Sequence, residues 1–140
     1  MVGRRGLLAG LFSFVVGYGI MVRQAMPVKS RVQLPLHKIT FTLPEDTKDA
    51  FFRQLRQFAD TYGFAIRIAP ITPDGEQFGV QMYQESIKLL GDNALDTKEV
   101  FIGFYQQGEN AVPAPYLTKL VDGLKQAVQA VPGVTVLKES

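Results

Sequence analysis

Two acidic residues and the only histidine are the side chains whose types and positions could support catalysis. Glu85, Asp92 and His37 lie near points where the strand pattern of the sequence changes, and bulges at such points occur beside active sites. Their carboxylates and imidazole could hold a small ligand or transfer protons. A triad of Ser86, His37 and Asp92 can be composed, but no serine occurs in a GxSxG motif, so the spacing does not support a hydrolase.

A second group of possible ligands lies in the segment GDNALDTKE. Asp92, Asn93, Asp96 and Glu99 supply the oxygen atoms that hard cations such as calcium prefer. However, the segment lacks the alternating ligand spacing and the glycine of a calcium loop, and Lys98 lies among the acids. The segment therefore predicts a polar turn between strands, without a metal.

Composition and motifs exclude several other chemistries. The chain has no cysteine, which excludes disulfides, thiolate metal sites, a cysteine nucleophile and the acylated cysteine of a lipoprotein. A single histidine excludes HExxH, and neither a Walker loop nor GxGxxG occurs. We therefore predict no cofactor and no enzymatic activity.

After the N-terminal segment, the first half of the chain predicts a strand, a helix and a second strand. Apolar residues alternate over 32–43 and change parity around 37–38, which indicates a bulge or two strand segments. An apolar stripe with helical spacing over 51–62 predicts an amphipathic helix that ends at Gly63. A strand over 64–69 follows.

The second half predicts further strands and a second helix. The expected elements are a PDG turn at 73–75, a strand from Gln77 with an irregularity near 84–85, a loop over 91–99, a strand over 100–105, a helix over 115–131 and a strand over 134–137. Each helix has one apolar stripe, so both helices most simply pack on one face of a sheet.

The predicted fold class is therefore α+β, a two-layer sandwich. We expect a mixed sheet of about four to six strands with two helices on one face, in the order strand-helix-strand-strand-strand-helix-strand. At the level of architecture this resembles the ferredoxin-like split βαβ arrangement. That fold class hosts many activities and suggests none by itself.

The second face of this sheet is the better functional candidate. If the helices cover one face, Tyr83, Phe101 and Tyr105 project from the other, where aromatic side chains mark a partner surface. The alternative is that a loop, the connector or another strand covers them. Glu85 and Asp92 are the polar candidates beside these aromatic residues.

The N-terminal segment Leu7–Val22 contains 16 residues without a charge, between Arg5 and Arg23. As a helix it would rise about 24 Å, slightly less than a hydrocarbon core of roughly 30 Å. We expect an uncleaved anchor with a cytoplasmic N-terminus. A signal sequence cleaved after Gly19 and a buried soluble helix are the alternatives. The spacing of Gly6 and Gly10 also permits close helix pairing.

The net charge of +2 comes from the N-terminal region. From residue 39 onward, nine Lys and Arg residues stand against 13 Asp and Glu residues, so the folded part is acidic. Nucleic-acid binding needs clustered cations on the folded surface, and we therefore predict no nucleic-acid partner. The basic residues near the N-terminal segment would instead lie beside anionic lipid headgroups.

These observations predict three regions and one function. We expect a membrane anchor or signal sequence at 1–23, a juxtamembrane connector at 24–31 and an extracytoplasmic domain at 32–140. The expected function is a non-enzymatic protein-binding module at a bacterial inner membrane, with its domain in the periplasm. It would be an accessory subunit of an envelope complex or an immunity-type inhibitor of a toxin. The alternatives are a small-ligand site at Glu85, Asp92 and His37, and a structural protein that self-associates.

Overall fold

The computed structural model describes residues 33–140 of the chain. Pro35–Ser140 form one unit. The predicted anchor Leu7–Val22 and the connector at 24–31 lie outside the described residues. Within the described range, no helix is long and apolar enough to cross a membrane.

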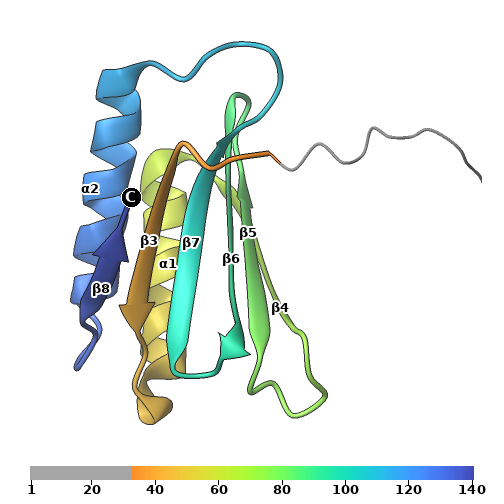
Figure 1. The fold of residues 1–140 in the computed structure, drawn as a ribbon, viewed down its shortest axis with the longest axis vertical. Coiled ribbons are helices and arrows are strands. Elements are labelled where there is room, and N and C mark those ends of the chain that lie inside the picture. The colour runs from red at the N-terminus through yellow and green to blue at the C-terminus, as the bar shows by residue number, and fades with distance from the viewer. Residues whose placement is uncertain (1–32) are drawn as a thin grey trace, which may run out of the picture. The chain divides into compact units, whose positions relative to one another are not determined.

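The domain consists of six strands, two α-helices and one 3₁₀ turn (Figure 1). In chain order these are β3 (His37–Thr42), η3 (Glu45–Thr47), α1 (Lys48–Tyr62), β4 (Ala65–Pro70), β5 (Phe78–Tyr83), β6 (Ile87–Asp96), β7 (Glu99–Gln106), α2 (Ala114–Gln129) and β8 (Val136–Glu139). The predicted α+β class is confirmed.

The sheet has the order β4-β5-β6-β7-β3-β8, and every pair of neighbours is antiparallel. The expectation of a mixed sheet is therefore wrong. Each helix joins two strands that run in the same direction: α1 joins β3 to β4, and α2 joins β7 to β8. At least one strand of opposite direction lies between the two strands of each pair, so no two neighbouring strands are parallel. The edges of the sheet are β4 and β8.

Between the helices the chain forms four strands, where the sequence predicted three. The predicted irregularity near Gln84 is a hairpin turn, in which the Gln84 N–H donates to the carbonyl of Ile87 at 2.9 Å. The apolar parity changes there because the chain reverses direction. The predicted loop over 91–99 is also wrong: β6 continues to Asp96, and only a tight turn separates it from β7.

The ends of the domain also differ from expectation. The strand predicted to begin at Val32, which lies outside the described range, begins at His37; Leu34 is 80% exposed and lies in no strand. Pro35 has no N–H to donate to a ladder, which favours this late start. At the other end, β8 extends to Glu139, and Ser140 exchanges two backbone hydrogen bonds with Lys38.

Both predicted helices are confirmed, with their apolar stripes buried. The first ends at Gly63, whose φ of 77° is the left-handed conformation that glycine adopts readily. The helices contact one another where Gly123 of α2 meets the Tyr62 ring, since a Cβ at Gly123 would lie only 2.5 Å from the Tyr62 hydroxyl oxygen.

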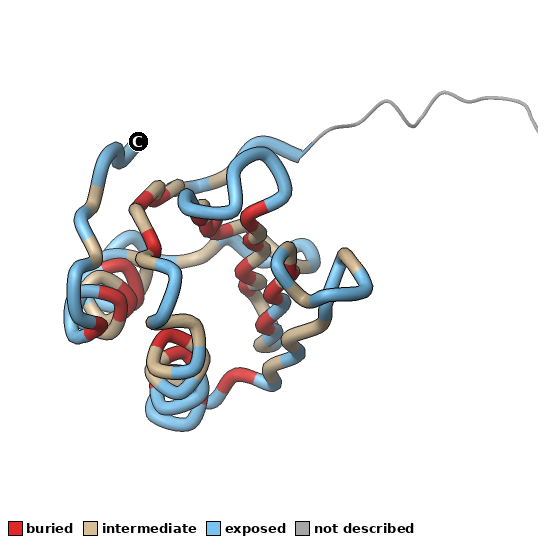
Figure 2. Tube along the Cα trace, turned by 90° about the horizontal axis from the view of Figure 1, so that it is seen from below, coloured by how far each residue is buried: buried red, intermediate tan, exposed pale blue. Residues whose placement is uncertain are grey.

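One core lies between the helices and one face of the sheet (Figure 2). Buried residues alternate with more exposed ones along β5, the first seven residues of β6 and, apart from the buried Gly103, β7, so each strand turns alternate side chains toward the helices. The largest fully buried side chains are Phe41, Phe51, Phe78, Phe104, Ile39, Leu55, Met82, Ile87, Leu89, Ile102, Leu120 and Leu124. The alternate side chains therefore form a second sheet face that the two helices do not cover.

Candidate functional site

The sheet face away from the helices, here called the open face, carries four of the five predicted binding residues. Cross-strand pairing places Asp92 opposite Phe101. Lys88 lies opposite Tyr105 on one side and Tyr83 on the other. The structure thus brings these aromatic residues and Asp92 to one surface, and their role in binding stays a prediction.

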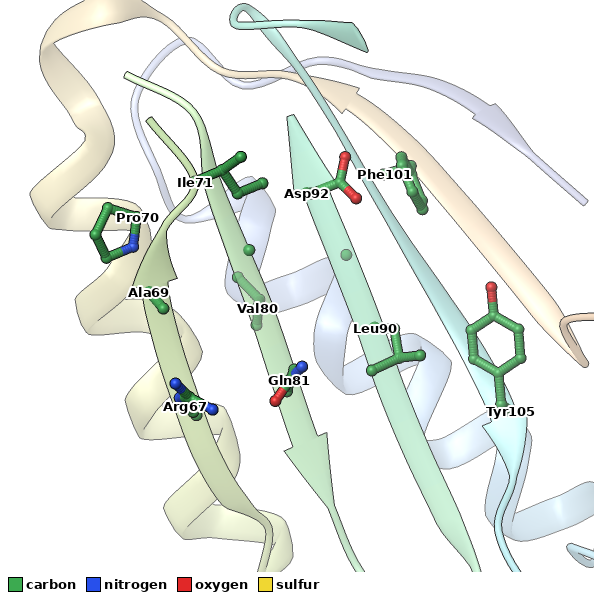
Figure 3. A pocket seen from close by; sticks show the side chains of 12 residues that line it. Arg67, Ala69, Pro70, Ile71, Val80, Gln81, Leu90, Asp92, Phe101 and Tyr105 are labelled. Carbon is green, nitrogen blue, oxygen red and sulfur yellow. The ribbon is translucent and has the colours of Figure 1, made fainter. Parts of the chain in front are cut away.

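A hollow of about 520 Å³ lies on the open face over strands β4 to β7 (Figure 3). Ile71, Leu90 and Phe101 contribute apolar lining, and Arg67 and Asp92 contribute charged groups. Its volume is within the range of about 300–1,000 Å³ that ligand sites usually have. Because its lining comes mainly from one sheet face, the hollow stays open on the opposite side.

The two aromatic residues of the hollow are held by specific neighbours. The Lys38 ammonium nitrogen lies 4.8 Å from the centre of the Phe101 ring, a cation–π contact. The Tyr105 side chain leans along β7 toward Phe101 and lies over Gly103, where an added Cβ would come within 2.9 Å of the Tyr105 ring and hydroxyl. Both rings are half-buried, so they offer apolar surface in a fixed position.

The charged groups of the hollow differ in how they are held. One carboxylate oxygen of Asp92 accepts the backbone N–H of Ala94 at 2.9 Å. The ion pairs within residues 33–140 join Glu139 to His37 and Lys125, so Arg67 has no carboxylate partner in this range. An exposed guanidinium without a carboxylate partner can donate two parallel hydrogen bonds to a carboxylate.

The three residues of the predicted small-ligand site do not come together. His37 lies on the helix side of β3, where its ring packs edge-on against Phe104 and its Nε2 lies 2.8 Å from a Glu139 oxygen. Glu85 is exposed in the turn between β5 and β6. It precedes Asp92 by seven residues, which corresponds to roughly 20 Å along a strand.

The His37 imidazole instead belongs to a small ionic group at the edge strand β8. Glu139 accepts hydrogen bonds from the Lys125 ammonium at 3.0 Å and contacts His37 at 2.8 Å. These bonds, first that of Lys125 and then that of His37, lower the pKa of the Glu139 carboxyl. The arrangement ties β8 to α2 and β3.

The oxygen-rich segment after Gly91 has a structural organisation. Asn93 is 1% exposed; its Oδ1 accepts the Phe78 N–H at 2.8 Å, and its Nδ2 donates to the carbonyls of Glu76 and Thr97 at 2.9 and 3.2 Å. Both the oxygen and the nitrogen of this side-chain amide therefore bond to backbone groups. Within the described part of the chain, no group of three or more His, Asp and Glu residues could hold a metal.

Sequence reasoning missed the β4 side of the open face, including Arg67. The sequence predicts a strand over 64–69 but assigns neither of its faces, and Arg67 falls at the alternate position between Ala65 and Ala69. The PDG turn could have supplied the signal, because a hairpin there fixes the pairing of Arg67 with Gln81.

A comparison with known protein families and with curated proteins finds no match for this chain.

Proposed function

We propose that the chain is a non-enzymatic protein-binding module whose open face contacts a partner protein. The observation that carries this proposal is the uncovered sheet face with its hollow and its half-buried Phe101 and Tyr105. Aromatic residues and arginine are enriched at the centres of protein interfaces, and Arg67 lines the same hollow from β4, across β5 and β6 from these rings. A partner would cover the side that the helices leave open.

The proposal includes the expected location. The uncharged segment Leu7–Val22 would hold the domain at a bacterial inner membrane, on the periplasmic side, with cleavage after Gly19 as the alternative. There the module would serve as an accessory subunit of an envelope complex or as an immunity-type inhibitor. The absence of cysteine fits a domain that an apolar core stabilises without disulfides.

We also propose a ferredoxin-like architecture with one additional hairpin. Its support is the strand order, in which β3 lies between β7 and β8 while the helices connect β3 to β4 and β7 to β8. Without β5 and β6, this order would be that of the four-stranded split βαβ arrangement.

The central experiment is site-specific photo-crosslinking of the full chain in membranes of its native cells. A photoreactive phenylalanine analogue replaces Tyr105 on the open face or Lys119, which is exposed on α2. We expect one crosslinked protein at position 105, identified by mass spectrometry, and none at 119. Phe101→Ala should reduce the yield at 105.

Two results would reject the proposed face. One is the absence of any crosslink at position 105, and the other is an equal yield of the same product at 119. Circular dichroism of the Phe101→Ala variant provides the folding control, since Phe101 lies outside the buried core. Unchanged spectra with a reduced yield assign the loss to the interface.

The expected location has a separate test. Cell fractionation followed by intact-mass measurement should find the uncleaved chain in membranes, and protease added to spheroplasts should digest the domain. A full-length product that remains in the soluble cytoplasmic fraction would contradict the membrane tether.

Two alternatives remain, a small-ligand function and self-association. Of the three residues predicted for a small-ligand function, Asp92 lines the hollow, and Glu85 and His37 lie outside it. Self-association would use the open face or the N-terminal glycines. Two differently tagged copies expressed together would then be recovered as one crosslinked product, and recovery of monomers alone would remove that alternative.

A further inference from the structure

Three glycines lie in the interiors of the central strands, and the fold explains two of them. A Cβ at Gly91 would lie 2.3 Å from the Phe101 carbonyl oxygen, and one at Gly103 would lie 2.9 Å from the Tyr105 ring. The obstacle at Gly91 is backbone, so that position requires glycine, whereas at Gly103 glycine is what lets the Tyr105 ring lie flat over β7.

Gly79 has no such requirement. A Cβ there would meet only the Gly91 carbonyl oxygen at 3.9 Å and the Ile71 Cδ1 at 4.0 Å, which are ordinary contacts. Gly79 is also absent from the glycines with positive φ, so its backbone suits any residue. Glycine weakens a strand interior, and it often occurs where a ligand approaches the backbone closely.

The position of Gly79 connects this observation to the hollow. Gly79 lies on β5 opposite Asp92 of β6 and Ala69 of β4, and it is part of the hollow's lining. A larger side chain at this point of the open face would project into the hollow. The missing side chain therefore gives the hollow its depth, between the apolar groups of Ile71 and Leu90.

The charged lining indicates what else an occupant carries. Arg67 has no carboxylate partner within residues 33–140, and its planar guanidinium matches a carboxylate. A free small molecule is usually enclosed over most of its surface, whereas this hollow is covered from one side only. A protein segment can enter the hollow with one side chain and cover it with the rest of its surface.

We infer that the hollow receives an apolar side chain of a partner protein over Gly79, and that an adjacent Asp or Glu of the partner pairs with Arg67. This inference rests on the proposed function and specifies its recognition chemistry. Asp92 faces the same occupant and disfavours a second acid in the segment, so one acid beside one apolar residue fits best.

The chain offers a variant that blocks the hollow without damaging the fold. In Gly79→Val the Cβ has space, and a β-branched residue suits a strand. Thr40→Val is the matched control, because Thr40 lies on the same face but outside the hollow. Arg67→Gln removes the guanidinium, and Arg53→Gln on the exposed side of α1 makes the same change of charge elsewhere.

The experiment uses the ¹⁵N-labelled full chain in neutral detergent micelles. The probes are short blocked peptides with a Phe-Asp or a Phe-Lys pair, and the readout is the shift of the Gln81 and Leu90 amide signals. We expect the Phe-Asp peptide to bind roughly tenfold or more tightly than the Phe-Lys peptide. Gly79→Val and Arg67→Gln should each weaken it about tenfold, and the two controls should not.

Several results overturn the inference. They are equal binding of both peptides, binding that Gly79→Val leaves unchanged, and no saturable shift with either peptide. A shift caused by phosphatidylglycerol in the micelles, without one from the peptides, would assign the face to lipid instead. If crosslinking through position 105 still captures a protein in any of these cases, the binding function stands and only the recognition chemistry fails.

Discussion

Replacing Asn93 with alanine should destabilise the domain more than any other single polar substitution within β6. Its side-chain amide makes three hydrogen bonds to backbone, at 2.8, 2.9 and 3.2 Å. These bonds join β6 to Phe78, Glu76 and Thr97. Each such bond contributes about 0.5–1.5 kcal/mol net. In addition, the buried Phe78 N–H would lose its acceptor, at a cost of about 1–3 kcal/mol.

Because these contributions overlap, we expect the free energy of unfolding to fall by about 2–4 kcal/mol. For a domain of this size that corresponds to a fall in Tm of roughly 10–20 °C. Thermal and urea unfolding of the full chain, followed by circular dichroism, measure both quantities. Asn110→Ala, in an exposed loop, is the matched control and should change stability by less than about 0.5 kcal/mol.

Asn93→Asp separates the acceptor from the donor. The introduced carboxyl can still accept the Phe78 N–H, but it faces two carbonyl oxygens where the amide donated. Burial beside these oxygens raises the pKa of the introduced carboxyl, so this variant should gain stability as the pH falls. A loss below about 1 kcal/mol for Asn93→Ala, or no pH dependence for Asn93→Asp, would refute the reasoning.

Three further predictions concern packing and pH. Gly91→Ala should lower the free energy of unfolding by about 1–3 kcal/mol or more, because the added Cβ would meet the Phe101 carbonyl oxygen at 2.3 Å. Urea unfolding measures this change, and Gly79→Ala is the neutral control. Phe51→Ala should lower it by about 3–5 kcal/mol through a core cavity, and a change below about 1 kcal/mol would contradict the assigned burial. Glu139→Gln should be less stable than wild type near neutral pH. Because the bond from Lys125 lowers the folded-state pKa of Glu139, this difference should disappear as the pH falls through that pKa, which unfolding curves at several pH values would show.

The helices were predictable because their signals are local. Apolar residues recur with helical spacing over 51–62, and Gly63 supplies the left-handed residue at the end of α1. The PDG turn likewise contains the residues that turn geometry requires. Each of these signals lies within one short stretch of sequence, so it needs no knowledge of the partner strand.

The β5–β6 hairpin was not recognised because its turn, Gln84 to Ser86, contains no Gly, Pro, Asn or Asp. The end of β6 was missed for the opposite reason. Its polar residues resemble a loop, and Asn93 can be buried only because backbone groups from other segments satisfy its amide. Both errors come from interactions that are distant in sequence.

Part of the candidate site was predictable, because the alternation of side chains along a strand is a local signal. The aromatic residues on β5 and β7 were assigned to the uncovered face from alternation alone. The hollow could not be foreseen, since its depth depends on Gly79 lying between Ala69 and Asp92 across two strand pairings. Glu85 and His37 were chosen by proximity to apparent bulges, one of which is a turn and the other the start of a strand.

The two outer strands of the sheet influence how copies of the protein behave at high concentration. The β4 strand is six residues long, carries Arg67 and ends in Pro70, and β8 has four residues that include Lys138 and Glu139. Short edge strands that carry charged residues or proline are poor templates for the addition of another strand, which is the usual route to fibrils. Within residues 33–140, the two edges of the sheet should therefore resist strand addition between copies, and the proposed partner contact would form on the open face rather than by pairing with an edge strand.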